Sequence, residues 1–274
     1  MKMISIIITT KNEENVIGDL LKSLKKQKYK DFEIILVDNN SNDKTCEIAK
    51  KYTNKVFIKG PERSVQRNFG VSKALGEYVL ILDADMKLSE NVLLELSNVK
   101  EKVVIIPEKS FGKGFWVKYK VFEREFYEGE EVVEAPRYFS KELFLEFNGY
   151  DKDITGPEDY DLPLRMKKAG IRIGHVKSYI FHNEKNFSPF KSAKKKFYYA
   201  SKSAKYLQKH PEMAIKQGNL LFRPVFFKKW RKLIKHPILS LGMFFVRIIE
   251  MSGAFFGFVY HLFGKFIYSG IIKR

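Results

Sequence analysis

The first hundred residues alternate between short, continuously apolar segments and amphipathic segments, and this pattern restricts the fold most. Strands that are apolar at nearly every position are buried on both faces, as in parallel sheets covered by helices. The expected strands are Ile4–Thr10, Glu33–Val37, Lys55–Ile58, Tyr78–Leu82 and Val103–Ile106. The helices expected between them are Glu13–Gln27, Asp43–Tyr52, Ser64–Ala74 and Glu90–Val99. The sequence therefore predicts an α/β fold with a mostly parallel sheet flanked by helices.

Carboxylates follow two of these strands at the point where each strand ends. Asp38 follows the second strand, and Asp83 and Asp85 follow the fourth. Ligands of such sheets bind beyond the carboxyl ends of the strands, and residues two apart on an extended chain point the same way. Since an unpaired buried carboxylate is costly, the aspartate pair favours a hard divalent cation, Mg²⁺ or Mn²⁺, that carries phosphate oxygens. Two solvated aspartates in a loop are the alternative.

A second acidic cluster opens the helix expected from Glu158 to Ala169. The helix dipole alone explains Asp159 and Asp161, whereas a functional interpretation makes one of them a general base. No GxGxxG or GxxxxGK[ST] motif is present, so phosphates are not held by a Rossmann or Walker loop. Residues 109–134 lack a clear period, and we expect them to form a mobile connection over the site.

Five segments carry a family resemblance. In order, they are SIIITTKNEENVIGDLLKSL, FEIILVDNNSND, RSVQRNFGV, LILDADMKL and GPEDYDLPLRMKKAG. With these motifs the chain resembles a family 2 glycosyltransferase with the GT-A fold over residues 3–183. The resemblance implies inverting transfer of a sugar from a UDP- or GDP-sugar to an acceptor hydroxyl or phosphate. No QxxRW motif is present, which disfavours processive polymer synthesis.

The resemblance also implies the roles of individual residues. Those expected to bind the nucleotide-sugar are Thr10, Asn12, Glu13, Asp38, Asn40, Arg63, Arg67 and Asp83. Asp85 is the expected direct metal ligand, with Asp83 and His182 as further ligands, and Asp159 is the expected general base. The alternatives are a structural role for His182 and a solvated helix face for the two arginines.

The positive charge of the chain lies in its last third. Residues 1–184 contain 31 Lys and Arg against 30 Asp and Glu, whereas residues 185–274 contain 19 against 2. Basic and aromatic residues interleave there, a pattern that suits an anionic surface, either membrane or nucleic acid. We therefore expect a catalytic domain over residues 1–185 and a basic, helical membrane-association region over residues 186–274.

The strongly apolar stretch 237–272 favours a membrane over nucleic acid as the partner. Arg247 and Glu250 interrupt it one helical turn apart, where they could pair with each other. Two short interfacial helices, or a hairpin within one leaflet, then fit better than a clean span. Packing on the catalytic domain and a homodimer interface are the alternatives. The lysines favour the anionic cytoplasmic face of the membrane, and hence a lipid-linked acceptor.

Two other functions fit parts of the sequence. A nucleotidyltransferase shares the alternating sheet and the acidic metal site, but it is expected to have a glycine-rich first loop that bears lysine or arginine, and TTKNEEN is not such a loop. A nucleic-acid-binding protein would use the basic tail, and the apolar stretch that follows argues against it. The single cysteine, Cys46, fits a reducing compartment.

Overall fold

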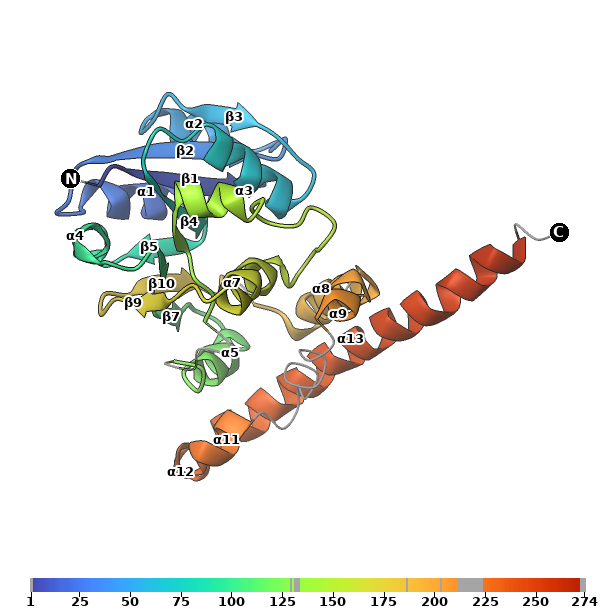
Figure 1. The fold of residues 1–274 in the computed structure, drawn as a ribbon. Coiled ribbons are helices and arrows are strands. Elements are labelled where there is room, and N and C mark those ends of the chain that lie inside the picture. Colours follow the sequence, from blue (N-terminus) through green and yellow to red (C-terminus); the bar gives the residue numbers. More distant parts are fainter. Residues whose placement is uncertain are drawn as a thin grey trace. The chain divides into compact units, whose positions relative to one another are not determined.

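The chain is described from a computed structural model, which covers residues 2–128, 130, 134–185, 187–202, 204–210 and 224–271 (Figure 1). It divides into two compact units. Unit 1 comprises Met1–Ser110, Glu128–Lys152 and Glu158–Asn183, and unit 2 comprises Phe111–Tyr127, Asp153–Pro157 and Glu184–Arg274. The chain therefore passes between the units several times, whereas the sequence suggests one boundary at residue 185. The membrane role of the C-terminal region stays a prediction.

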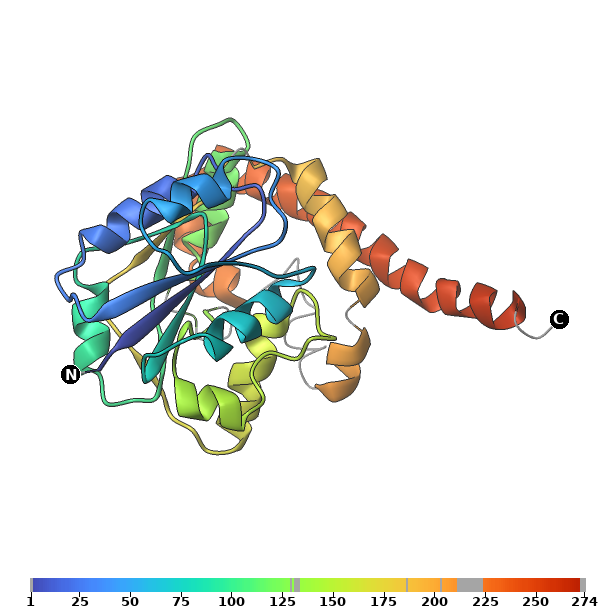
Figure 2. The same cartoon turned by 90° about the horizontal axis from the view of Figure 1, so that it is seen from above.

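Unit 1 contains a seven-stranded sheet with the order β3-β2-β1-β4-β8-β6-β9 (Figure 2). Its strands are β1 (Ile4–Thr10), β2 (Phe32–Asp38), β3 (Val56–Ile58), β4 (Tyr78–Asp83), β6 (Val103–Ile105), β8 (Tyr138–Ser140) and β9 (Ile173–His175). All neighbours are parallel except β8, which is antiparallel to both β4 and β6. The predicted α/β fold with a mostly parallel sheet is confirmed.

Helices cover both faces of the sheet, which explains the uninterrupted apolar strands. The core on one face includes residues of α1 (Ile17–Lys25), α2 (Thr45–Lys50) and α4 (Val92–Asn98). The core on the other includes residues of α3 (Arg63–Ser72), α6 (Lys141–Glu146) and α7 (Glu158–Lys168). Along β1, Ile6 and Ile8 belong to the first core and Ile7 to the second, so both pleat faces need apolar side chains.

A second, three-stranded sheet has the order β5-β10-β7. Its strands are β5 (Met86–Leu88), β7 (Glu108–Phe111) and β10 (Ile180–Asn183). The antiparallel register places His182 opposite Met86, the residue after Asp85 in the LILDADMKL motif. In the described part of residues 109–134, β7 ends and α5 (Val117–Arg124) follows, so the segment is partly helical. The expectation that it is a mobile connection over the site stays a prediction.

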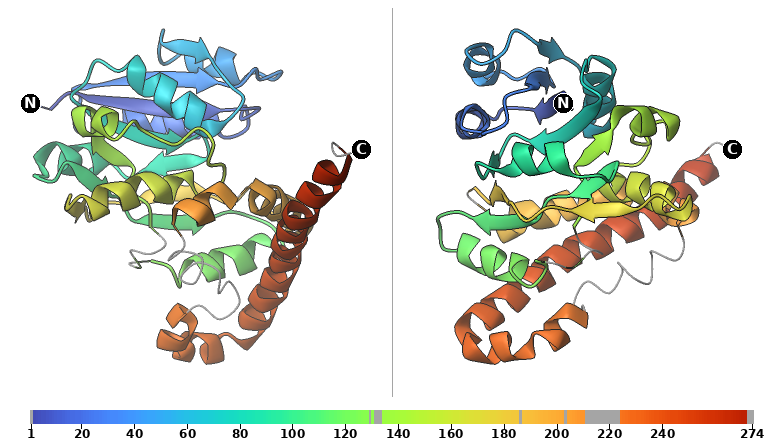
Figure 3. Two further views of the ribbon diagram at one scale, coloured as in Figure 1. Left: turned by 45° about the vertical axis from the view of Figure 1, so that its right-hand side comes forward. Right: turned by 60° about the vertical axis from the view of Figure 1, so that its left-hand side comes forward.

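Unit 2 is helical, with α5 followed by α8 (Pro189–Lys202), α9 (Ala204–Lys209), α11 (Pro224–Lys228), α12 (Trp230–Lys235) and α13 (Pro237–Ile271) (Figure 3). The expectation of two short helices or a hairpin is wrong, because α13 is one continuous helix of 35 residues. By length and composition alone, its Pro237–His261 portion is long and apolar enough to cross a membrane.

Arg247 and Glu250, two charged residues of α13, are neutralised by α5 and not by each other. Arg247 donates to the Glu123 carboxylate and, at 2.7 Å, to the Tyr127 hydroxyl, and Lys120 donates to Glu250 at 3.1 Å. Arg247 and Glu250 are only 4% and 7% exposed. The predicted Arg247–Glu250 pair is therefore replaced, because packing against α5 removes water and each buried ion needs a partner within that contact.

The packing of α3 on β1 can be tested at a glycine. A Cβ added to Gly70 would lie 2.3 Å from Ile7 Cγ2, whereas one on Gly18 in α1 has its nearest neighbour at 3.9 Å. We expect Gly70→Ala to lower the free energy of unfolding by about 1–3 kcal/mol through overpacking. The matched change Gly18→Ala should raise it by up to about 1 kcal/mol, because alanine favours helix. Denaturant unfolding measures both, and equal effects would contradict the packing.

Candidate active site

The carboxyl ends of β1 and β2 are joined through the buried carboxylate of Asp38. Thr10 Oγ1 donates to Asp38 Oδ1 at 2.6 Å. The backbone N–H of Ser41 donates to Oδ2 at 2.7 Å, and the Ser41 hydroxyl to Oδ1 at 2.6 Å. Asp38 is fully buried, so in this structure it holds the loop between β2 and α2 in place.

The first loop, between β1 and α1, is tied to this second loop. The N–H of Asn12 donates to Ser41 Oγ at 2.7 Å, and the N–H of Glu13 donates to Thr45 Oγ1 at 2.8 Å. Asn12 and Asn40 have φ angles of 55° and 50°, in the left-handed region that asparagine tolerates better than most residues. The structure therefore brings together the residues predicted from the first two motifs.

Gln66 is a site residue that the sequence analysis missed. It lies on α3 and is buried, and its Nε2 donates to the carbonyls of Thr10, at 3.1 Å, and Val37, at 2.8 Å. It thereby satisfies two backbone acceptors at the ends of β1 and β2. The available signal was position, because Gln66 lies one turn before Gly70, on the face of α3 that packs on the sheet.

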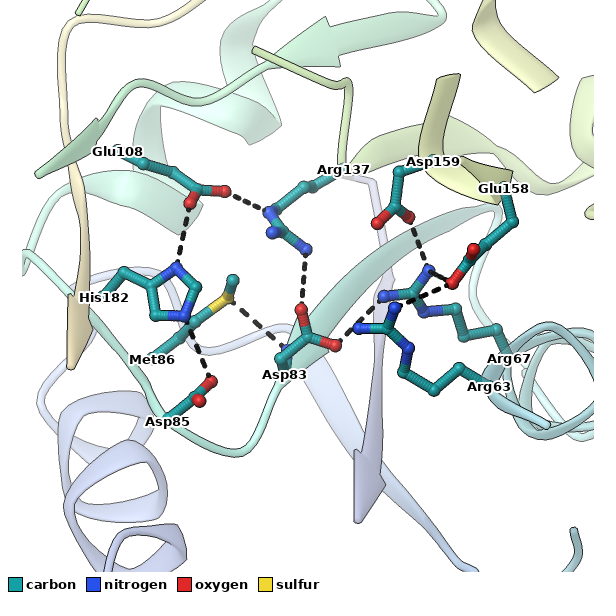
Figure 4. Close-up of polar contacts among 10 residues, drawn as sticks. All are labelled: Arg63, Arg67, Asp83, Asp85, Met86, Glu108, Arg137, Glu158, Asp159 and His182. Atoms are coloured by element: carbon teal, nitrogen blue, oxygen red, sulfur yellow. Dashed lines mark hydrogen bonds and ion pairs between the residues drawn. The ribbon is translucent and has the colours of Figure 1, made fainter. Parts of the chain in front are cut away.

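Arg67 stands at the centre of the site (Figure 4). Its side chain is fully buried. Its Nη2 lies 3.0 Å from Asp83 Oδ1, and its Nη1 donates to Asp159 Oδ1 and lies 3.8 Å from Glu158 Oε1. The guanidinium carbon is 5.3 Å from the centre of the Tyr150 ring. The alternative of a solvated helix face is therefore wrong for Arg67.

These contacts shift the protonation of the groups involved. Burial by itself lowers the pKa of Arg67, but Asp159 and Asp83 outweigh it and hold that pKa well above its usual value. Burial raises the pKa of Asp83, yet Arg67 and Arg137 bring it well below its usual range. Burial and the nearby Asp159 raise the pKa of Glu158. Arg63 Nη2 lies 3.1 Å from Glu158 Oε1. The guanidinium groups of Arg67 and Arg137 together thus keep the carboxylate of Asp83 ionised.

The network continues from Asp83 to the three-stranded sheet. Arg137 Nη1 lies 3.5 Å from Asp83 Oδ2, and Arg137 Nε donates to Glu108. Glu108 Oε2 lies 3.3 Å from His182 Nδ1, and His182 Nε2 lies 3.5 Å from Asp85 Oδ1. Figure 4 shows the resulting line of alternating charge from Asp85 to Asp159.

Burial shapes this end of the network as well. It disfavours the charged imidazole, but hydrogen bonds to Asp85 and Glu108 prevail and raise the pKa of His182 to about 10. Burial also disfavours the ionised form of Glu108, but Arg137 and His182 outweigh it and lower the pKa of Glu108 to about 2. Glu108 and Arg137 were not predicted from the sequence, because neither lies in one of the five motifs or in a clearly periodic segment.

The predicted metal ligands do not all converge. Among the described residues, no group of three or more His, Cys, Asp and Glu side chains is arranged to hold a metal ion. Asp85 and His182 face each other, whereas Asp83 is held by two arginines. A carboxylate oxygen and a neutral imidazole nitrogen can ligate Mn²⁺ or Mg²⁺ if phosphate oxygens and water complete the shell, so a bound ion would take the place of the proton on His182. Asp85 and His182 therefore fit such an ion, and a ligand role for Asp83 stays a prediction.

Two solved structures share this fold. The mannosyltransferase PcManGT from Pyrobaculum calidifontis, solved in complex with GDP-Man and Mn²⁺, superposes with a TM-score of 0.63 at 16% identity, over 96% of this chain and 88% of that one. Residues 1–349 of S. aureus TarS, solved in complex with UDP-GlcNAc, give a TM-score of 0.55 at 19% identity, over 96% and 92%. At these identities the likeness shows the fold, which is that of the GT-A glycosyltransferases.

The sequence comparisons give the family. The model of glycosyl transferase family 2 matches residues 5–149, more than half of the chain. The chain therefore belongs to this family, as its motifs predict.

Relatives within the family differ in length. Staphylococcus aureus TarS, a poly(ribitol-phosphate) β-N-acetylglucosaminyltransferase, is 28% identical over 220 residues, which are 74% of this chain but 36% of TarS. The chain thus spans about a third of that relative. The GalNAc(5)-diNAcBac-PP-undecaprenol β-1,3-glucosyltransferase of Campylobacter jejuni is 26% identical over 181 residues, 58% of each chain.

The dependence of the site on Arg67 can be measured as stability. Arg67→Met leaves Asp83, Asp159 and the buried Glu158 without their shared cation, and we expect the free energy of unfolding at neutral pH to fall by about 3 kcal/mol. Since the folded-state pKa of Asp83 is lowered, its contribution is present above the ordinary carboxyl pKa and fades as the pH falls. The deficit of the variant should therefore narrow under acid conditions.

The matched control is Arg172→Met, because Arg172 is exposed and its loss should change stability by no more than about 0.5 kcal/mol. Denaturant unfolding at several pH values gives both numbers. Equal stability of the two variants would contradict the central position of Arg67.

Proposed function

We propose that this chain transfers a sugar from a nucleotide-sugar to an acceptor hydroxyl or phosphate with inversion of configuration. The observation that carries the proposal is the charged line of Figure 4, which joins a metal-fitting pair, Asp85 and His182, to the acidic start of α7 within one compact unit. Membership of glycosyl transferase family 2 supports it and favours it over a nucleotidyltransferase. The donors UDP-GlcNAc and GDP-Man of the two solved structures support a UDP- or GDP-sugar.

The donor is proposed to lie over the first two loops. Thr10, Asn12, Glu13 and Asn40 belong to the joined segments at the carboxyl ends of β1 and β2, where ligands of such sheets bind. Asp38 is fully buried beneath its own loop, so direct contact with a base or ribose requires that loop to open. Arg63, on the more exposed side of α3, is proposed to meet the anionic part of the donor.

Asp159 is proposed as the general base. Its side chain is 24% exposed, so an acceptor hydroxyl can reach it, while Arg67 holds one of its oxygens. As the hydroxyl oxygen attacks the anomeric carbon, its proton passes to the Asp159 carboxylate and the nucleotide diphosphate leaves from the opposite side. One displacement with one base inverts the configuration, unlike the double displacement of retaining enzymes.

Asp85 and His182 are proposed to hold Mg²⁺ or Mn²⁺ beside the donor diphosphate. When bound, such an ion supplies Lewis-acid stabilisation of the leaving diphosphate. Glu108 contacts His182 Nδ1 and thereby fixes the orientation of the imidazole ring, as partners of ligating histidines commonly do. The Mn²⁺ bound in the PcManGT complex supports a divalent ion in this fold.

The acceptor is proposed to be lipid-linked and to be met at the cytoplasmic face of the cell membrane. The Campylobacter relative, whose name specifies an undecaprenol-linked acceptor, supports this proposal. The basic and apolar character of the C-terminal region supports a membrane location as well. Nucleic acid is not proposed as a partner.

The role of Asp159 can be separated from donor binding. We expect Asp159→Asn to lower kcat by about 10²–10⁴-fold, because the amide cannot accept the proton, while donor affinity stays near the wild-type value. Nucleotide release assays and calorimetry with the donor measure the two quantities. Asp31→Asn, at an exposed aspartate, is the matched control. Near-normal turnover of the Asp159 variant would remove this residue from the mechanism.

The metal site gives a further prediction. Asp85→Ala and His182→Ala should each raise the Mn²⁺ concentration needed for half-maximal transfer by at least about tenfold, since each removes a ligand. His175→Ala, at an exposed histidine, should leave the titration unchanged. Transfer rates measured across a series of Mn²⁺ concentrations decide the matter, and an unchanged midpoint in either variant would exclude that residue as a ligand.

A further inference from the structure

Helix α13 presents one face to the rest of unit 2. Met243, Val246, Arg247 and Glu250 on this face are between 0% and 7% exposed. A Cβ on Gly253 would lie 2.2 Å from the carbonyl oxygen of Ala193 in α8, so the backbones of these two helices are nearly in contact. Together with the ion pairs to α5, this packing fixes which face of α13 points outward.

The outward face is apolar over more than five turns. Its large side chains recur at helical spacing and are 51–73% exposed. They are Ile238, Leu241, Phe245, Ile248, Phe255 and Phe256, and we call this set the apolar stripe. The only charged residues from 237 to 260 are Arg247 and Glu250, both on the buried face. A soluble helix normally places charged side chains on its outer face, so the apolar stripe is expected to be a surface that a binding partner covers.

Exposed basic residues lie on α12 and α8, two helices that pack against α13. On α12, Arg231 and Lys235 are exposed beside Trp230 and Ile234, which are 52% and 68% exposed. On α8, the exposed basic residues are Lys191, Lys194 and Lys195. From residue 189 to 271, Glu250 is the only acidic residue in the described part of the chain, and it is buried. The binding partner must therefore accommodate apolar side chains and carry negative charge next to its apolar region.

We infer that the apolar stripe docks on an anionic phospholipid bilayer, with α13 lying in the plane of the interface. Apolar side chains then enter the acyl region while the neighbouring lysines and arginines meet lipid phosphates. Nucleic acid offers no apolar region for six large exposed side chains. This inference extends the membrane location proposed above and does not depend on the transfer reaction.

A transmembrane course of α13 conflicts with its packing. Ser192 donates to Glu250, and Gly253 and Gly257 lie against Ala193 and Phe197, so α8 runs beside the C-terminal half of the apolar Pro237–His261 portion. A span would carry the exposed lysines of α8 into the hydrocarbon, where charge is costly. In the interfacial orientation these lysines stay in water or among head groups.

Vesicle flotation of the full chain tests the docking. We expect binding to vesicles of phosphatidylcholine mixed with phosphatidylglycerol, and much weaker binding to phosphatidylcholine alone or at high salt. The double variant Leu241→Glu/Ile248→Glu should lower the partition coefficient by roughly a hundredfold or more. Leu75→Glu, a matched change at a 70% exposed leucine of unit 1, should leave it unchanged.

Loss of charge is tested separately, in case the stripe variant fails to fold. Arg231→Glu/Lys235→Glu should abolish the preference for phosphatidylglycerol, and thermal unfolding with a nucleotide-sugar checks that unit 1 still folds and binds donor. A chain that fails to float but still turns over donor would overturn the docking and leave the proposed function standing. A chain that floats but does not turn over donor would support the docking and contradict the proposed function.

Two measurements distinguish interfacial docking of α13 from a transmembrane span and from a dimer of this chain. An environment-sensitive fluorophore on Ser252→Cys, at the exposed face of α13, should shift to the blue on vesicles, whereas one on Lys194→Cys in α8 should not, both in a Cys46→Ser background. A shift at both positions would indicate a span. Sedimentation without lipid tests a second copy of the chain as the cover, and a stable dimer that the stripe variant dissociates, with flotation unchanged, would overturn the inference.

Discussion

The ion pairs of one buried guanidinium hold unit 1 together at its functional edge. Arg67 comes from α3, Asp83 from the end of β4 and Asp159 from the start of α7, so one side chain links three elements distant in sequence. A buried cation without partners would be strongly destabilising, and so would two or three carboxylates gathered without it. The positions of the strand end and of the helix start are therefore coupled through this residue.

The ion pairs that couple these elements also connect the groups proposed to act in the reaction. Asp83 is shared by Arg67 and Arg137, and Arg137 leads through Glu108 to His182 and Asp85. The proposed base and the proposed metal ligands thus lie at opposite ends of one chain of alternating charges. Each group between the two ends of that chain is oriented by two neighbours, which limits its rotamers before any substrate arrives. Hydrogen bonds to Asp38 likewise tie the ends of β1 and β2 to the loop that follows β2.

Much of unit 1 could be predicted, because buried parallel strands have an unambiguous pattern. The range expected for β1 matches the structure, and those for β2 and β4 differ from it by no more than one residue at either end. The site was predictable where a charged residue directly follows such a strand, as at Asp38 and Asp83. Gln66, Glu108 and Arg137 were missed because their roles depend on partners in distant segments. Helix α5 was missed for a related reason, since Lys120 and Glu123 point inward to the ions of α13 and so disguise the amphipathic period.

The most direct measurement of the central claim is the configuration of the product. The full chain, incubated with UDP- and GDP-sugars, Mn²⁺ or Mg²⁺ and polyprenyl phosphate or a lipid-linked glycan as the acceptor, is followed by proton NMR for donor consumption and for the anomeric signal of the transferred sugar. A single displacement at the anomeric carbon, with Asp159 as the base, predicts a product whose configuration is opposite to that of the donor. A product that retains the donor configuration would contradict the account, and so would the absence of donor turnover across the panel.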